Sequence, residues 1–251
     1  MFWYENMTYQ EVNKHLNSKL VILPTGSIEQ HSVHLPLSVD SIIATKLSER
    51  LAEKLDAVVA PTLKYGARSL ANSGGGMIFP GTIGLSGKVL IPYYSQIIKG
   101  YVEAGAKRLL ILNAHWENEA FLIEAIEEIK DRLDGEVKIV QLSWWNVISE
   151  EDMKQIFGSF ASWNVEHAGQ AETALILELT PSLVGTFDTK VKTVIQNPNI
   201  YTNVENVDIL QNNGSLSQYS HVTKVMAKQF LELVDKRLYE MVGEVGLNEV
   251  C

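Results

Sequence analysis

Short apolar runs alternate with amphipathic helical segments along most of the 251-residue chain. Leu20–Leu23 (LVIL) and Leu109–Leu112 (LLIL) are apolar throughout, which is typical of strands buried on both faces of a sheet. The segment 41–55 instead has leucine and isoleucine at a spacing of four, which predicts a helix with one buried face. Repeated strand–helix alternation implies right-handed crossovers and predicts an α/β fold with a mostly parallel sheet covered on both faces.

The same pattern gives approximate bounds for the elements. We expect strands at 21–23, 57–63, 108–112 and 137–142, and helices at 41–55, 86–104, 117–133, 170–179 and 221–242. Residues 64–85, 144–167 and 182–219 lack this periodicity and are expected to be mainly loops. No internal repeat or domain linker interrupts the pattern, so residues 1–251 are expected to form a single domain.

Composition excludes several classes of function. The net charge is −9 and no basic cluster is present, which argues against nucleic acid or an anionic membrane as a partner. No apolar run approaches the ~18 residues of a membrane span, and the first residues lack the features of a signal peptide. Cys251 is the single cysteine, so no disulfide or thiolate metal site can form within the chain. We therefore expect a cytoplasmic protein with a small-molecule partner.

Residues of the types that bind metals follow two of the predicted strands. Glu29 and His31 come after the first apolar run, with Asp40 a little further on, and His115 and Glu117 come after the second. Ligands in open α/β sheets bind beyond the carboxyl ends of parallel strands, so both clusters can line one pocket. Three carboxylates and two imidazoles gathered there would repel each other and lose hydration unless cations were present. The pattern therefore favours a metal site, with two ions.

Each of these residues also has an ordinary structural interpretation. Asp40 precedes a predicted helix and could be its N-cap, and Glu117 could interact with the dipole of a helix in its first turn. His31 and His115 could be ordinary loop or strand-end histidines. Two pairs of an acid and a histidine, each after a strand, favour a shared site, but spacing alone leaves both interpretations open.

The donor set indicates the kind of chemistry. Oxygen and imidazole ligands without sulfur suit Zn²⁺, Mn²⁺ or Fe²⁺. A pair of such ions can lower the pKa of a bound water toward ~7, which predicts hydrolysis of a carbonyl or phosphoryl compound. The glycine-rich segment 73–82 lacks both phosphate-binding glycine motifs, so we interpret its glycines as turns or as a close approach to a small ligand.

An aromatic segment follows the last predicted strand. Trp144, Trp145 and Trp163 could be core residues, or they could form the walls of a pocket for a flat, partly cationic molecule. Glu166 and His167 come next, and His167 is either an exposed loop residue or a proton donor beside the metals. The sequence alone favours the structural interpretation for this segment.

Over nearly its whole length the chain resembles the creatininase family, the creatinine amidohydrolases. The matching stretches are residues 23–31, 34–37 with Asp40, 73–76, 79–82, 113–118, 163–167 and 172–173. His-Trp-Glu-Asn at 115–118 is similar to the His-Tyr-Glu-Asn of true creatininases, whereas many family members have His-Gly-Gly-Asn there. The resemblance therefore implies the creatinine-type branch, which opens a cyclic amide and converts creatinine reversibly to creatine.

This resemblance also implies a fold, cofactors and residue roles. The fold would be a three-layer α/β/α sandwich that assembles as a homohexamer and holds two divalent ions, Zn²⁺ and/or Mn²⁺. One ion would be bound by Glu29, Asp40 and His115, and the second by His31, Asp40 and Glu117, with Asp40 bridging. The catalytic residues would be Glu117 and His167, of which His167 transfers a proton. The substrate pocket would be lined by Ser73, Trp116, Trp145, Trp163 and Glu166.

The chain departs from the creatininase pattern at several positions near the pocket. Trp116 replaces a tyrosine, Asn164 an aspartate and Ala114 a glycine, and residues 34–37 follow the broader family pattern. Small changes in a small pocket can alter specificity by orders of magnitude. One alternative is therefore a related metal-dependent hydrolase that acts on another cyclic or formylated small molecule. Another alternative is a non-catalytic small-molecule binding protein with structural metal.

Overall fold

A parallel sheet forms the centre of the molecule. The computed structural model describes residues 2–133, 135–159, 161–194 and 200–248, so Cys251 lies outside the described residues. Within them, the sheet has the strand order β1-β3-β2-β4-β5, and all neighbouring strands are parallel. The strands are β1 (Phe2–Trp3), β2 (Leu20–Thr25), β3 (Val58–Val59), β4 (Arg108–Asn113) and β5 (Lys138–Ser143). The predicted α/β class is confirmed.

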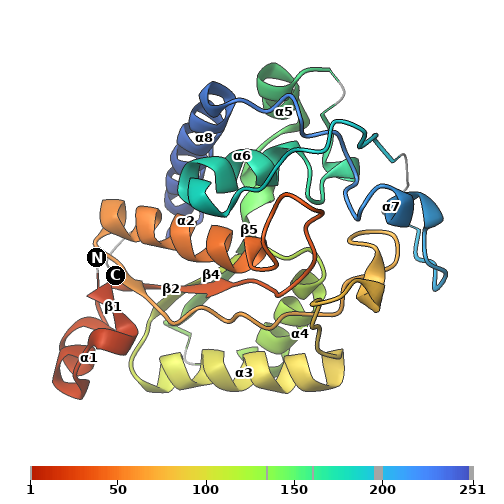
Figure 1. Cartoon of the computed structure of the whole chain (residues 1–251). Helices are drawn as coiled ribbons and strands as arrows, with labels where there is room; N and C mark the ends of the chain where they lie inside the picture. Colours follow the sequence, from red (N-terminus) through yellow and green to blue (C-terminus); the bar gives the residue numbers. More distant parts are fainter. Residues whose placement is uncertain (1, 134, 160, 195–199, 249–251) are drawn as a thin grey trace.

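Helices cover both faces of the sheet. The α-helices of the described residues are α1 (Tyr9–His15), α2 (Val39–Leu55), α3 (Gly87–Glu103), α4 (Asn118–Lys130), α5 (Glu150–Phe157), α6 (Gln170–Leu179), α7 (Val207–Gln211) and α8 (Lys224–Glu244). Short 3-10 helices are found at Tyr4–Asn6, Gly76–Ile78, Trp144–Val147, Trp163–Val165 and Pro181–Leu183. Figure 1 shows α2, α6 and α8 on one side of the sheet and α3 and α4 on the other. This arrangement is the three-layer sandwich that the family resemblance implies.

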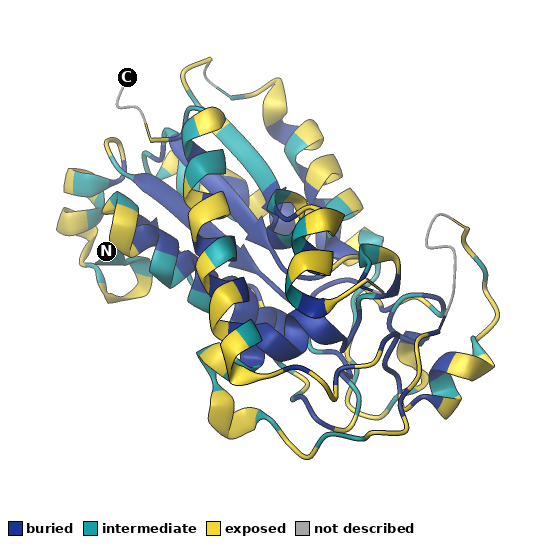
Figure 2. Ribbon diagram, turned by 90° about the horizontal axis from the view of Figure 1, so that it is seen from above, coloured by how far each residue is buried: buried dark blue, intermediate teal, exposed yellow. Residues whose placement is uncertain are grey.

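The two faces of each strand belong to two separate hydrophobic cores. In β2, Leu20 and Ile22 pack into the core shared with α2, α6 and α8, whereas Val21 and Leu23 pack into the core shared with α3 and α4. Successive side chains of a strand point to opposite faces, so a strand between two helical layers must be apolar at every position. Figure 2 shows the resulting buried centre, with exposed residues on the outer faces of the helices.

Several elements differ from the prediction. The strand expected at 57–63 is hydrogen-bonded as a strand only at β3, and a single bridge between Thr25 and Leu63 continues it. The segment 144–167, expected to be mainly loop, contains α5, which begins after a capping box formed by Ser149 and Asp152. The last helix begins after Thr223, whose side chain accepts a hydrogen bond from the Met226 N–H. Helix α1 and strand β1 were not expected.

The topology determines where the segments after β2 and β4 lie. These strands are hydrogen-bonded neighbours, and their last residues, Thr25 and Asn113, are paired. The chain therefore leaves both strands at the same edge of the sheet, and the polar clusters that follow emerge side by side. Among the described residues, no helix is both long and apolar enough to cross a membrane.

Candidate active site

Buried carboxylates and imidazoles converge beyond the carboxyl ends of β2 and β4. One group comprises Glu29, His115 and Glu117, each of which offers a ligand atom within 4.8 Å of those of the other two. His115 Nδ1 lies 3.2 Å from Glu29 Oε2, and His115 Nε2 lies 3.3 Å from Glu117 Oε2. Both strand-end clusters therefore contribute to the same buried site.

A second group comprises His31, Asp40 and Glu172. His31 Nε2 lies 3.1 Å from Asp40 Oδ1 and 3.5 Å from Glu172 Oε1. The other oxygen of Asp40, Oδ2, lies 3.0 Å from His115 Nδ1 in the first group. Asp40 thus lies between the two groups, with one oxygen toward each. It occupies the first turn of α2 behind Ser38, the residue at the N-cap position, so the capping interpretation of Asp40 does not hold.

This grouping differs from the one implied by the resemblance at two residues. Glu117 lies with Glu29 and His115, and Glu172 occupies the position beside His31 and Asp40 that the resemblance gave to Glu117. Sequence reasoning quoted Glu172 as part of a matching motif but assigned it no role. Glu172 lies in the first turn of α6, where an acidic residue commonly interacts with the helix dipole. For this reason the sequence alone does not identify it as a metal ligand.

The residues fit a pair of divalent cations. Glu29 Oε1, His31 Nε2 and Asp40 Oδ2 are buried and, within the described part of the chain, have no hydrogen-bond partner. Buried polar atoms are normally paired, so a set of unpaired electron-pair donors around one space points to cations. The lack of sulfur and the mixture of imidazole and carboxylate suit Zn²⁺ or Mn²⁺. His115 Nε2 lies 3.1 Å from the Ala67 carbonyl, so Nδ1 is the nitrogen of His115 that a metal ion would bind.

The pKa directions show that this cluster requires positive charge. Burial raises the pKa of Glu29, but the nearby imidazoles of His167, His115 and His31 outweigh it and hold that pKa below its usual range. In the same way, burial lowers the pKa of His115, but the neighbouring carboxylates raise it well above its usual range. Without a metal, protonated imidazoles supply the charge that the carboxylates need, and divalent cations would supply it directly.

Glu117 is held in place by the glycine-rich loop. Its Oε1 accepts hydrogen bonds from the Leu70 N–H, at 2.9 Å, and from the Ser73 hydroxyl. Burial raises the pKa of Glu117, while His115 opposes the shift. Glu117 stands at the N-cap position of α4 but caps no backbone N–H with its side chain. The interpretation of Glu117 as only a partner of the helix dipole therefore omits its main contacts.

Gly74 allows this loop to approach the cluster closely. A Cβ atom at this position would lie 2.0 Å from Glu29 Oε1 and 2.6 Å from Ser69 Oγ. No side chain larger than hydrogen fits without displacing the carboxylate, so the expectation that these glycines allow a close approach applies at Gly74.

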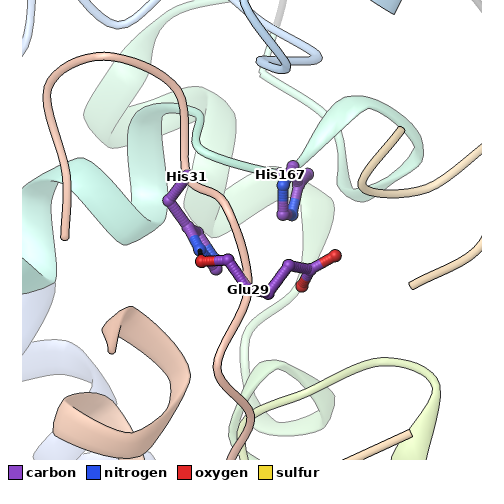
Figure 3. Close-up of side chains that lie close together, drawn as sticks. All are labelled: Glu29, His31 and His167. Atoms are coloured by element: carbon purple, nitrogen blue, oxygen red, sulfur yellow. Dashed lines mark hydrogen bonds between the residues drawn. The ribbon is translucent and has the colours of Figure 1, made fainter. Parts of the chain in front are cut away.

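His167 completes the pocket from the opposite side. Figure 3 shows Glu29 and His31 on one loop and His167 on the segment that faces it. The rings of His31 and His167 are 4.5 Å apart between centroids, and His167 is buried. The neighbouring Glu166 accepts hydrogen bonds from the Ala171 and Glu172 N–H groups at the start of α6. Burial and the charge of Glu172 raise the pKa of Glu166 to about 8.

Tryptophans wall the mouth of the site. The pocket is lined by the following residues: Glu29, Asp40, Ser73, His115, Trp116, Glu117, Trp144, Trp145, Trp163, Glu166, His167 and Glu172, with six smaller or apolar neighbours. The Trp116 and Trp145 rings are stacked at 5.8 Å, and the Trp163 indole N–H donates to the Ile148 carbonyl. The substrate-pocket residues expected from the sequence therefore all line this one cavity.

Fold and site together define a class. Buried carboxylates and imidazoles converge at the carboxyl edge of a parallel sheet, beneath an aromatic-walled pocket, which is the arrangement of a metal-dependent hydrolase. The family model described as creatinine amidohydrolase matches residues 5–242. The chain therefore belongs to the creatininase family of hydrolases.

Individual relatives differ in what they act on. The chain is 37% identical over 171 residues to the creatinine amidohydrolase of Pseudomonas putida, a match covering 66% of each chain. It is 26% identical over 183 residues to the 3-dehydro-scyllo-inosose hydrolase of Thermotoga maritima, covering 72% of this chain and 57% of that enzyme. A mycofactocin precursor peptide peptidase of Mycolicibacterium smegmatis is 30% identical over 171 residues, covering 64% of this chain and 58% of the peptidase. The matches thus span between 57% and 66% of the length of these curated relatives.

Solved creatininases share the fold over almost the whole chain. A crystal structure of creatinine amidohydrolase is 28% identical, with a TM-score of 0.88 and coverage of 96% of both chains. A manganese form is 28% identical with a TM-score of 0.86, covering 96% of this chain and 97% of that one. A glutamate-to-glutamine mutant creatininase is described in a Zn-Zn form and in a complex with creatine, each 29% identical with a TM-score of 0.87 and the same coverage.

Proposed function

We propose that this chain is a dinuclear-metal-dependent amidohydrolase that opens a small cyclic amide, with creatinine and creatine as its substrate pair. The observation that carries the proposal is the pair of buried ligand groups joined by Asp40 at the base of a tryptophan-walled pocket. The creatinine-type relative and the creatine complex of a solved creatininase support creatinine over other cyclic amides.

The proposed metal ligands are the six residues of the two groups. Glu29, His115 and Glu117 would hold one ion and His31 and Glu172 the other, with Asp40 shared between them. Zn²⁺ and Mn²⁺ are proposed because solved creatininases are described in Zn-Zn and Mn forms. When bound, such ions polarise a carbonyl oxygen and lower the pKa of a coordinated water.

The chain's own residues would orient the substrate and move a proton. Trp116, Trp145 and Trp163 offer ring faces to a flat, partly cationic ring and limit the entry of bulk water. Opening creatinine breaks the ring C–N bond, adds the elements of water and leaves a proton on the released nitrogen. We assign delivery of that proton to His167, which is buried at the pocket wall opposite Glu29. Ser73 and the Leu70 N–H hold Glu117 in one orientation.

A creatinine–creatine interconversion assay with added Mn²⁺ tests this proposal. Wild-type protein is expected to form creatine from creatinine and to run the reverse reaction. Glu117→Ala is expected to abolish both directions, while Glu124→Ala, at an exposed glutamate of α4, should leave them unchanged. Equal activity of the wild type and Glu117→Ala would reject the assignment of Glu117.

Relatives with other substrates set the competing outcomes. An inosose hydrolase and a precursor peptide peptidase share the family. A chain that binds metal but leaves creatinine unchanged would belong with such enzymes, and assays on cyclic ketones and short peptides would identify which. A wild type that binds metal and is inert to all of these substrates would favour the non-catalytic binding protein.

The domain boundary, location and assembly are also part of the proposal. We propose that residues 1–251 are one creatininase-like domain, that the protein is cytoplasmic, and that it forms the homohexamer implied by the family resemblance. Sedimentation velocity measures the assembly directly, and a monomer of 28.0 kDa at micromolar concentration would contradict the hexamer.

A further inference from the structure

Gln30 is buried between Glu29 and His31, and its side chain contacts three separate segments. Its Nε2 lies 2.8 Å from the Gly74 carbonyl, 2.9 Å from the Gly214 carbonyl and 2.9 Å from His167 Nε2. Its Oε1 accepts a hydrogen bond from the Ser32 N–H at 2.8 Å. Because a backbone N–H faces one end of the amide and two carbonyls face the other, the network fixes which end carries the NH₂ group.

The Gln30 NH₂ group has fewer hydrogens than polar atoms within hydrogen-bond distance. An amide NH₂ has two hydrogens, and the Gly74 and Gly214 carbonyls can only accept, so both hydrogens are used when both carbonyls are satisfied. None is then left for His167 Nε2. That nitrogen has a second neighbour, the backbone carbonyl of Gln30 itself, at 3.0 Å. A carbonyl accepts, so this bond forms only when His167 Nε2 carries a proton.

Counting bonds selects one tautomer of His167. With the proton on Nε2, His167 donates to the Gln30 carbonyl and both glycine carbonyls keep their donors, while the 2.9 Å approach of the amide nitrogen to Nε2 is then a contact between two donors. With the proton on Nδ1, Nε2 must accept from the amide, so one glycine carbonyl and the Gln30 carbonyl lose their partners. In the described part of the chain no hydrogen bond is found at Nδ1, this atom is not among the fully buried unpaired atoms, and His167 lines the pocket.

Glycine at 214 permits this arrangement. A Cβ atom there would lie 2.2 Å from Gln30 Oε1, and the backbone φ is +82°, in the left-handed region that favours glycine. The Leu216 N–H donates to the backbone carbonyl of His167 at 3.0 Å, so the same segment also holds the His167 main chain. The loop-rich segment after α6 therefore has a defined role beside the site.

We propose that Gln30 is a positioning residue that holds His167 as the tautomer protonated at Nε2, which leaves Nδ1 as the nitrogen that exchanges a proton in the pocket. This inference deepens the proposed function, since it rests on proton transfer by His167. Water gives up a proton to Nδ1, and Nδ1 passes it to the nitrogen released when the C–N bond breaks. The Nε2–H bond to the Gln30 carbonyl stays intact throughout and stabilises the charged ring between the two steps.

Imidazole ¹⁵N NMR of the Zn²⁺-loaded protein tests the tautomer without any turnover. Two-bond ¹H–¹⁵N correlations distinguish the two neutral tautomers, and His167→Gln identifies the signals of His167. We expect the wild type to be protonated at Nε2. A wild type protonated at Nδ1 would overturn the proposal, whatever its activity toward creatinine, so this result and failure of the proposed function are distinguishable.

Two substitutions of Gln30 separate positioning from simple loop anchoring. Gln30→Met and Gln30→Glu both remove the donors to Gly74 and Gly214, but the introduced carboxylate would give Nε2–H another acceptor and the thioether would not. We expect the glutamate variant to keep the proton on Nε2 and the methionine variant to show a mixture of tautomers. In Gln30→Met we also expect kcat to fall by about tenfold or more, with KM within about threefold, because proton transfer contributes ~10²-fold or more.

The matched control is Gln155→Met, the same change at an exposed glutamine of α5, which should behave as the wild type. A Gln30→Met variant with the wild-type tautomer and the wild-type kcat would overturn the role of the amide. Equal tautomer mixtures in the methionine and glutamate variants would show that Gln30 only anchors the loops.

Discussion

Gly74→Ala tests the geometry of the metal cluster without changing any of its ligands. The added Cβ would lie 2.0 Å from Glu29 Oε1, and such contacts are essentially never shorter than 3.0 Å, so the carboxylate must move by about 1 Å. A displacement of ~1 Å at a catalytic centre can cost roughly 10²-fold in rate. We therefore expect kcat/KM to fall about 100-fold and one metal ion to bind more weakly.

The fold should tolerate this change. The φ of Gly74 is not in the left-handed region, so alanine adds no backbone strain there. Overpacking costs roughly 1–3 kcal/mol of unfolding free energy, which the whole domain can absorb.

Steady-state kinetics with creatinine and metal analysis by mass spectrometry give the two readouts. Gly100→Ala is the control, because nothing lies within 4 Å of a Cβ added there. A folded Gly74→Ala protein with wild-type kinetics and two tightly bound ions would refute the assignment of Glu29 as a ligand.

Three further perturbations act on the same site. Chelation of both ions should lower the Tm by about 10–20 °C, because each ion bound at 100 times its dissociation constant contributes ~2.7 kcal/mol. Calorimetry with and without chelator checks this, and equal melting temperatures would contradict it. Trp116→Tyr should keep kcat/KM within about threefold of the wild type, since the tyrosine still stacks on Trp145, whereas Trp116→Ala should raise KM about tenfold. A Trp116→Ala variant with unchanged KM in steady-state kinetics would count against the aromatic wall. In the chelated protein, the pKa of Glu166 is raised from 4.5 to about 8, so between these pH values the folded state binds more protons than the unfolded state and the unfolding free energy should fall as pH rises. Urea titrations across this range should show a weaker pH dependence of the unfolding free energy in Glu166→Gln, and identical pH profiles would contradict the raised pKa.

The sequence predicted the fold and the meeting of the two clusters for a clear physical reason. The unbroken apolar runs Leu20–Leu23 in β2 and Leu109–Leu112 in β4 require two covering layers, and parallel neighbours end at one edge of the sheet. Those two facts alone bring Glu29 and His115 together, although they are far apart in the chain. The residue pattern also grouped Asp40 with these ligands, with a helix cap as the alternative, and the family resemblance implied its position between two ions.

Other features depend on contacts that no local pattern records. Glu172 reaches His31 because α6 packs against α2 and α8, and the sequence around Glu172 has the features of an ordinary helix start. The link from Gln30 to Gly214 joins loops that the topology brings together only after folding. The strand expected at 57–63 is reduced to β3, because beyond it only Ala60 and Leu63 keep contact with β2, through a hydrogen bond to the Ile22 carbonyl and a bridge to Thr25. Local periodicity describes burial on one element and does not determine which loops meet.

Anomalous scattering from crystals grown with Mn²⁺ or Zn²⁺ tests the central claim most directly. We predict two anomalous peaks, one among Glu29, His115 and Glu117 and the other among His31 and Glu172, with Asp40 between them. A single peak, or two peaks of which neither contacts Asp40, would contradict a shared two-metal centre.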